Sequence, residues 1–164
     1  MNDIRYCTPE WLEQSKERYD ATPAFKEQLS KITSKLFFRI TAEPSWGIGE
    51  DILFGAIVEE GRLLELRFFN EEEAKSTADF IMAASPLKWK KILRKEKKFL
   101  TEFMLGQVAL EHGSKVGVLG LAPYAPTFID ALTQFPLRFP DDMTAAELHT
   151  YKSDLASFRA SANV

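Results

Sequence analysis

The chain has 164 residues, of which 45% are hydrophobic and 27% are charged, and its formal net charge is -3. This length and composition are typical of a soluble globular protein with one domain and a substantial core. A slightly acidic chain also argues against general nucleic-acid binding, because that function usually depends on a strongly basic domain.

The first part of the chain predicts an N-terminal helical extension at residues 8–33. Each of its two helices begins with a capping threonine followed by proline, Thr8-Pro9 and Thr22-Pro23, and proline suits the first turn of a helix. We expect the first helix to end near Tyr19. The apolar residues of the second recur at helical spacing as far as Ile32.

Strands follow the helices, because the sequence becomes rich in aromatic and β-branched residues. We expect strands at residues 36–42, 51–59 and 62–69, with Glu60-Gly61 as a tight hairpin turn between the last two. The Trp46 to Gly49 segment lies before a strand and lacks a third glycine in register. It therefore predicts a turn and not a phosphate-binding loop.

The remaining elements alternate between strand and helix. Asn70 with Glu73 and Thr144 with Glu147 have the spacing of capping boxes at helix starts. The patterns predict strands at 78–84 and 107–111, helices at 87–94 and 99–105, an apolar helix whose regular part starts near residue 127, and a helical tail at 141–160. The order favours an α+β fold with a mostly antiparallel sheet covered by helices.

Catalytic and metal-binding signals are weak in this sequence. His112 and His149 are the two histidines, and neither has the spacing of a metal ligand, so we predict no metal site and no cofactor. Cys7 is the single cysteine and cannot form an internal disulfide, which favours a reducing, cytoplasmic setting. No signal peptide or membrane span is expected. One hypothesis is a small enzyme that uses Tyr124, Asp130 or His112. Nothing in the sequence places an acid and a base together, so we predict no catalytic residue.

A basic segment at residues 88–98 surrounds a few apolar side chains. It fits three interpretations: an ordinary surface helix, a nucleic-acid contact, or an amphipathic helix that docks on anionic lipid headgroups. The segment that follows is rich in phenylalanine, which favours lipid over nucleic acid. The predicted contacts with a transient anionic membrane surface are Lys88, Lys90, Lys91 and Arg94.

Thirteen phenylalanines imply a large apolar interior, either packed solid or enclosing a cavity. The segment from Ala78 to Ser114 resembles the sterol carrier protein 2-like (SCP2-like) family in the order of its elements. Ala78 to Ala84 matches a strand of the family, Trp89 with Ile92 and Leu93 matches its next helix, and Phe103 to Gly113 matches a final segment centred on a glycine. The resemblance covers roughly residues 36–132, which would be the core of a single SCP2-like domain spanning residues 1–164.

The resemblance implies a five-stranded sheet covered by helices, with an apolar cavity between them. It also implies noncatalytic binding or transfer of a sterol, fatty acid, acyl-CoA or other lipid. Arg39 or Arg67 could meet a carboxylate or phosphate headgroup, although an exposed strand face is the commoner explanation for both. The predicted lipid-binding residues are Phe80, Met82, Trp89, Phe99, Phe103, Met104, Phe128, Leu132 and Phe135.

An alternative function is a protein-interaction or dimerisation module. In that interpretation the apolar groove is filled by a partner helix, by a second copy in a homodimer, or by the chain's own tail. The feature that separates the two functions is the face of the tail that carries Leu148, Tyr151 and Leu155.

Overall fold

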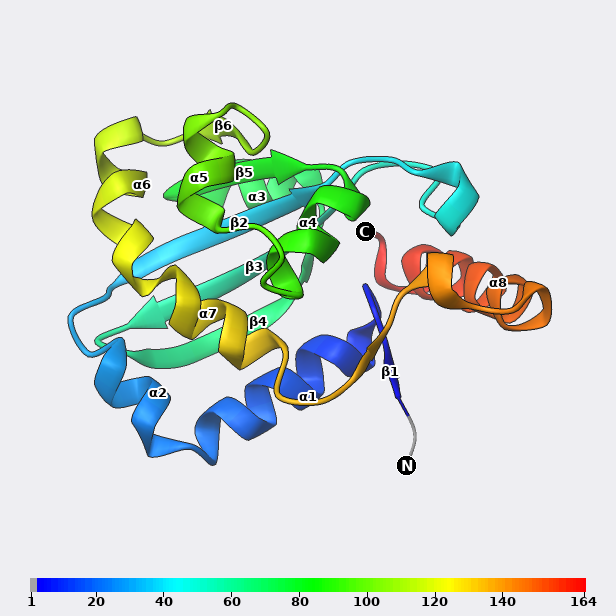
Figure 1. Ribbon diagram of the computed structural model, residues 1–164, viewed down its shortest axis with the longest axis horizontal. Helices are drawn as coiled ribbons and strands as arrows, with labels where there is room; N and C mark the ends of the chain where they lie inside the picture. The colour runs from blue at the N-terminus through cyan, green and yellow to red at the C-terminus, as the bar shows by residue number, and fades with distance from the viewer. Residues whose placement is uncertain (1–2) are drawn as a thin grey trace.

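A five-stranded sheet forms the centre of the computed structural model, which describes residues 3–164. The strands lie in the order β4-β3-β2-β5-β6 (Figure 1). β2 and β5 pair in parallel, and the other three neighbouring pairs are antiparallel. The α+β class and the mostly antiparallel sheet are therefore confirmed. The strands are β2 (Ser34–Ile40), β3 (Ile52–Glu59), β4 (Arg62–Phe69), β5 (Phe80–Ala84) and β6 (Ala109–His112).

The β3–β4 hairpin turns at Glu60-Gly61, as predicted. Both residues have positive φ, 47° and 79°, which is the backbone that a two-residue turn between antiparallel strands requires. Gly61 also leaves no room for a side chain, because an added Cβ would lie 2.3 Å from the carbonyl oxygen of Lys26. The turn therefore fixes the register of the hairpin and holds it against the N-terminal helices.

Helices cover the two faces of the sheet unequally. One face packs against α3, where Ala74 and Ala78 join a small core cluster with Phe37, Leu53 and Phe69. The other face supports a much larger core beneath the remaining helices of the fold (Figure 1). The helices are α1 (Pro9–Asp20), α2 (Pro23–Gln28), α3 (Glu71–Thr77), α4 (Pro86–Leu93), α5 (Phe99–Met104), α6 (Lys115–Leu121), α7 (Ala125–Leu132) and α8 (Ala145–Ala162), with short 3-10 turns at Pro44–Trp46, Ala122–Tyr124 and Pro140–Asp142.

Local capping signals place most helix starts correctly. Thr8 caps α1, and both capping boxes, Asn70 with Glu73 and Thr144 with Glu147, are present with each reciprocal hydrogen bond. The second helix is shorter than predicted and ends at Gln28. Leu29 and Ile32 are buried in the turn that follows, where the Gly61 amide donates to the Ile32 carbonyl.

The prediction for the apolar segment after residue 114 is wrong in detail. The structure has a separate helix, α6, which Ser114 caps, and α7 starts at residue 125 with Pro126 in its first turn. Gly117 and Gly120 weaken the helical signal of α6 because glycine is a poor helix former. Gly117 is needed for packing, since an added Cβ would lie 2.6 Å from the Phe80 ring.

Two very short strands join the N-terminal segment to the segment that precedes α8, and the sequence did not predict them. β1 (Ile4–Arg5) pairs in parallel with β7 (Leu137–Arg138), and α8 packs beside them at one end of the sheet (Figure 1). The Tyr151 hydroxyl of α8 donates to the Tyr6 carbonyl across 2.6 Å. Within residues 3–164, no helix combines the length and the apolar character needed to cross a bilayer.

Candidate functional site

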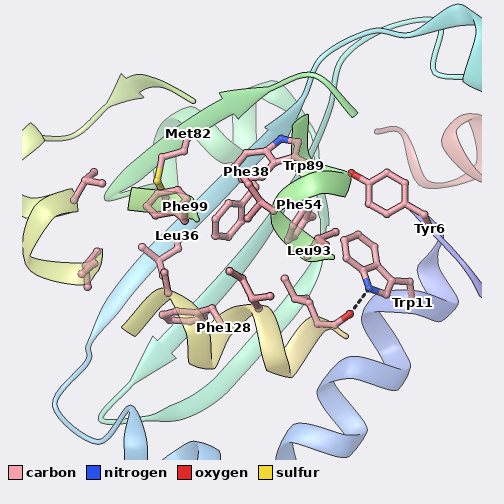
Figure 2. Close-up of a pocket in the computed structure, with 16 residues that line it drawn as sticks. Tyr6, Trp11, Leu36, Phe38, Phe54, Met82, Trp89, Leu93, Phe99 and Phe128 are labelled. Atoms are coloured by element: carbon pink, nitrogen blue, oxygen red, sulfur yellow. Dashed lines mark hydrogen bonds between the residues drawn. The ribbon is translucent and has the colours of Figure 1, made fainter. Parts of the chain in front are cut away.

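An apolar cavity lies between the sheet and the helices of the larger core. Its floor comes from the sheet, and its walls come from α4, α5, α6, α7 and the N-terminal segment (Figure 2). The floor residues are Leu36, Phe38, Phe54 and Met82. The wall residues are Tyr6, Trp11, Trp89, Ile92, Leu93, Phe99, Val118, Leu121, Ala125, Phe128, Ile129 and Leu132.

Strand alternation aims the floor residues at the cavity. Leu36 and Phe38 are two residues apart on β2, so their side chains share one face of the sheet, and Phe37 points to the opposite face. Phe54 is the cross-strand partner of Phe38 on β3, and their rings stack with centroids 4.9 Å apart. The floor therefore consists of two stacked aromatic rings with Leu36 and Met82 beside them.

One end of the cavity is closed by the N-terminal segment. Tyr6 and Trp11 are almost completely buried, and their ring centroids are 5.1 Å apart. The indole nitrogen of Trp11 donates to the Leu132 carbonyl across 2.9 Å, which ties α1 to α7 (Figure 2). At the other end Phe99, Leu121 and Phe128 are only half-buried. We therefore infer that the cavity opens where α5, α6 and α7 meet.

The cavity wall offers very little polar chemistry. The indole nitrogens of Trp11 and Trp89 donate to backbone carbonyls, so they are not free to bind a ligand. The Tyr6 hydroxyl is the remaining side-chain polar group of the lining. No carboxylate, histidine or lysine is part of this lining, so the cavity contains no acid–base pair. Its residues are suited to hold an apolar group.

The cavity is small, at about 80 Å³. Pockets that enclose drug-sized ligands usually measure roughly 300–1,000 Å³. A long acyl chain or a sterol would therefore enter only if the walls moved apart. Met82 is suited to such adjustment because its unbranched side chain can change rotamer at low cost.

Five of the nine predicted lipid-binding residues line the cavity: Met82, Trp89, Phe99, Phe128 and Leu132. They come from β5, α4, α5 and α7, so the fold brings together residues up to fifty positions apart in the sequence. Their contact with a lipid remains a prediction.

The other four predicted residues do not line the cavity. Phe80 packs against Gly113 and Gly117 at the far end of β5. Phe103 is buried behind Phe99, with their rings stacked 6.0 Å apart. Phe135 lies under the Arg18 guanidinium, and Met104 is 55% exposed on the outer side of α5. For Met104 the prediction of a cavity wall is wrong, because helical spacing puts its neighbour Phe103 on the inner face.

Sequence reasoning missed most of the floor and the closed end. Leu36 and Phe38 share one face of β2, but Phe37 between them is equally apolar, so the sequence does not mark which face lies toward the cavity. No local pattern marks Tyr6, because its position depends on pairing with residues more than 130 positions later.

The predicted membrane contact at Lys90 is wrong. Its side chain is buried, and its ammonium group lies 2.8 Å from Asp141 and 3.1 Å from Asp142. Arg94 is exposed but also pairs with Asp142, at 2.9 Å. The pKa of Asp142 is lowered first by the hydrogen bond from Lys90, then by the charge of Lys90 and by that of Arg94. Lys88 and Lys91 are exposed on α4. The basic helix is therefore partly neutralised by the segment that follows β7.

Neither arginine that was considered for a headgroup reaches the cavity. Arg39 shares the opposite face of β2 with Phe37 and contacts Glu71, Glu111 and Asp51. Its hydrogen bond to Glu71 raises the pKa of Arg39 and lowers the pKa of Glu71. Arg67 lies over the Phe69 ring on the same opposite face. Both guanidinium groups therefore have structural partners.

The residues of the enzyme hypothesis are not gathered in one site. His112 is exposed on β6, Asp130 pairs with Lys95 at 2.6 Å, and Tyr124 does not line the cavity. In the described part of the chain, no three histidine, cysteine or acidic side chains are grouped so that they could hold a metal ion.

Comparison with solved structures identifies the architecture. A conserved hypothetical protein of Thermus thermophilus, described as possibly a sterol carrier protein, is 18% identical, with a TM-score of 0.69 over 84% of this chain and 94% of that chain. A crystal structure of sterol carrier protein 2 is 20% identical, with a TM-score of 0.62 over 76% of this chain and 92% of that chain. The chain has an SCP2-like fold. The predicted resemblance is confirmed at the level of the fold.

A third SCP2-like structure, palmitated SCP2L2 of Aedes aegypti, is 14% identical, with a TM-score of 0.50 over 70% of this chain and 90% of that chain. No family model matches the sequence, and no curated protein matches it. The likeness to solved SCP2-like structures therefore rests on the fold, at sequence identities of 14% to 20%.

Proposed function

We propose that this protein binds a hydrophobic lipid in the cavity and carries it without chemical change. The observation that supports this function best is a cavity with an almost wholly apolar lining and no acid–base pair. The SCP2-like fold adds support, since the solved structures of this fold include sterol carrier protein 2 and a palmitated protein.

The energetics of such binding are favourable without polar contacts. Burial of an acyl chain contributes about 0.8 kcal/mol per methylene. The cavity of about 80 Å³ is too small for a long acyl chain, so α5, α6 and α7 would have to move outward. Part of the gain from burial offsets the cost of this movement. Loose selectivity for chain length follows from this mechanism.

Native mass spectrometry tests the proposal directly. Purified protein should retain a co-purified lipid, or take up one palmitate per chain after delipidation. Phe128→Asp puts a carboxylate at the half-buried wall and should reduce uptake at least tenfold, because an unpaired charge opposes entry of an acyl chain. Phe158→Asp is the matched control, since Phe158 is half-buried on α8 outside the cavity. If the delipidated wild-type protein takes up no palmitate, sterol or other lipid, the function is wrong.

The interaction-module alternative has less support. Tyr151 and Leu155 of α8 are buried, but no residue of α8 lines the cavity. The chain's own tail therefore does not fill the groove. A homodimer or a partner helix stays a prediction, and a clean apo mass with no lipid uptake would favour it.

We also propose that the open end of the cavity meets an anionic membrane. Exposed apolar side chains gather on the two helices that border this opening: Leu100 and Met104 on α5, Leu105 just after it, and Val116 and Leu119 on α6. Lys97, Lys98 and Lys115 flank these residues and make no ion pair within the described chain. Apolar residues surrounded by free lysines suit an anionic lipid surface.

A further inference from the structure

The Tyr6 hydroxyl is an unpaired polar group at the closed end of the cavity. The Tyr6 residue is 1% exposed, and its backbone is fixed on both sides, since its amide donates to Arg138 and its carbonyl accepts from Tyr151. Within residues 3–164 no group forms a hydrogen bond with its side-chain oxygen, which is nearly but not completely buried. In Figure 2 this oxygen points toward α4, which carries Trp89.

A hydroxyl that is nearly buried and has no partner in the protein is unfavourable, so its presence calls for an explanation. A fully buried group left unpaired costs about 1–3 kcal/mol, and the Tyr6 side chain keeps only a trace of accessible surface. Trp11 and Trp89, the other two lining residues with a polar atom, both bond to backbone carbonyls. Tyr6 therefore differs from its neighbours in keeping a donor and an acceptor available inside the cavity.

The surroundings of this hydroxyl select for a neutral ligand group. No cationic side chain lines the cavity, so a carboxylate or phosphate at this end would be buried without a counter-charge. The pKa of Tyr6 is raised well above its ordinary value, chiefly because burial disfavours the phenolate, so the hydroxyl keeps its proton. An alcohol or a carbonyl oxygen could form a hydrogen bond there at little desolvation cost.

We propose that Tyr6 is a ligand-recognition residue that forms a hydrogen bond with the hydroxyl or carbonyl group of a neutral lipid inserted polar end first. This inference rests on the proposed carrier function and adds the class of ligand and its orientation. A fatty acid would bind in the opposite sense, with its carboxylate at the open end between α5, α6 and α7.

The test compares three ligands of equal chain length: 1-dodecanol, dodecane and laurate. Their affinities for the delipidated wild-type protein and for Tyr6→Phe are measured by displacement of a fluorescent fatty acid. Tyr6→Phe should weaken dodecanol binding roughly tenfold, as expected for one buried hydrogen bond, and leave dodecane and laurate unchanged. Tyr124→Phe removes the same hydroxyl group outside the cavity and should change none of the three affinities.

The possible results distinguish a failure of the proposed Tyr6 role from a failure of the carrier function. Equal dodecanol affinity in the wild type and Tyr6→Phe would overturn the role of Tyr6 and leave the carrier function intact. A parallel loss for all three ligands would also overturn it, because a change in wall packing would then explain the effect. If the wild-type protein binds none of the three, the carrier function itself fails. Tyr6→Phe should fold normally, since the hydroxyl it removes bonds to no described residue.

Discussion

Arg39 shows how a single buried charge organises the face of the sheet opposite the cavity. Arg39 is only 9% exposed. Its guanidinium contacts Glu71, Glu111 and Asp51, which lie in three separate parts of the chain. A buried guanidinium is tolerated when several acceptors satisfy its five donors. Arg39 therefore links the start of α3, strand β6 and the loop before β3, while the cavity face of β2 remains apolar.

We expect the Glu71–Arg39 pair to make stability depend on acidic pH. The pKa of Glu71 is lowered from 4.5 by its hydrogen bond to Arg39, so the folded state prefers the carboxylate. The pair therefore stabilises the fold above the unfolded-state pKa, and this contribution is lost as the pH falls through the lower folded-state value. Glu71→Gln should reduce the free energy of unfolding by up to about 1 kcal/mol at neutral pH, because Glu71 is half-exposed.

Urea titration at neutral pH and at a pH well below 4.5 measures this effect. The difference between the wild type and Glu71→Gln should shrink on acidification. Glu72→Gln is the matched control, since Glu72 is exposed on the same helix and makes no ion pair with the described residues. A difference that stays constant with pH would show that the carboxylate charge of Glu71 is not the cause.

Among the individual elements, the unit formed by β1, β7 and α8 has the largest effect on the closed end of the cavity. β1 and β7 have two residues each, so their few hydrogen bonds alone would hold them weakly. Tyr151 of α8 strengthens the unit through its 2.6 Å bond to the Tyr6 carbonyl. Since Tyr6 also forms the closed end of the cavity, α8 stabilises a cavity wall that it does not itself touch.

Removing the Tyr151 hydroxyl should loosen this unit. Tyr151→Phe leaves the buried Tyr6 carbonyl without a partner, and we expect a loss of about 1–3 kcal/mol in the free energy of unfolding. Cys7 provides a local reporter, because it is fully buried and burial raises the pKa of its thiol to about 12. Alkylation of Cys7 should be slow in the wild type and faster in Tyr151→Phe. Unchanged stability and unchanged alkylation would contradict a bracing role for α8.

On the scale of the whole molecule, the two ends of the cavity differ in structure. The end near Tyr6 and Trp11 is held by β1, α1 and α8, whereas the opening is bordered by short helices, α5 with six residues and α6 with seven. Exposed apolar side chains occur on these same two helices. Ligand exchange is therefore expected at the α5–α6 end, where a membrane could receive both the apolar side chains and the lipid.

Vesicle binding tests this arrangement. Replacing both Met104 and Leu105 by Gln should weaken co-sedimentation with vesicles containing anionic lipid severalfold, since these residues are 55% and 66% exposed and their burial in lipid would be lost. Neither exposed side chain should be needed for folding. Leu64→Gln, at an exposed leucine on β4, is the matched control and should bind as the wild type does. Equal vesicle binding by all three proteins would exclude docking through this end.

Much of this architecture could be predicted from local sequence, because its causes are local. Capping at Thr8, Asn70 and Thr144 depends on residues three positions apart, and the Glu60-Gly61 turn depends on two adjacent residues. The richness of β2, β3 and β4 in aromatic and branched apolar residues is equally local. The failure at α6 has a physical reason, since Gly117 lowers helix propensity but is required beneath the Phe80 ring.

Only the tertiary structure decided which side chains enclose the cavity and which charges remain free. The sequence by itself determined an α+β chain with an apolar interior and a basic helix after β5. It could not show that Asp141 and Asp142 neutralise Lys90 from about fifty residues away, or that Tyr151 fixes Tyr6 from 145 residues away. Such contacts depend on how separate elements pack, because neither partner's local sequence encodes the position of the other.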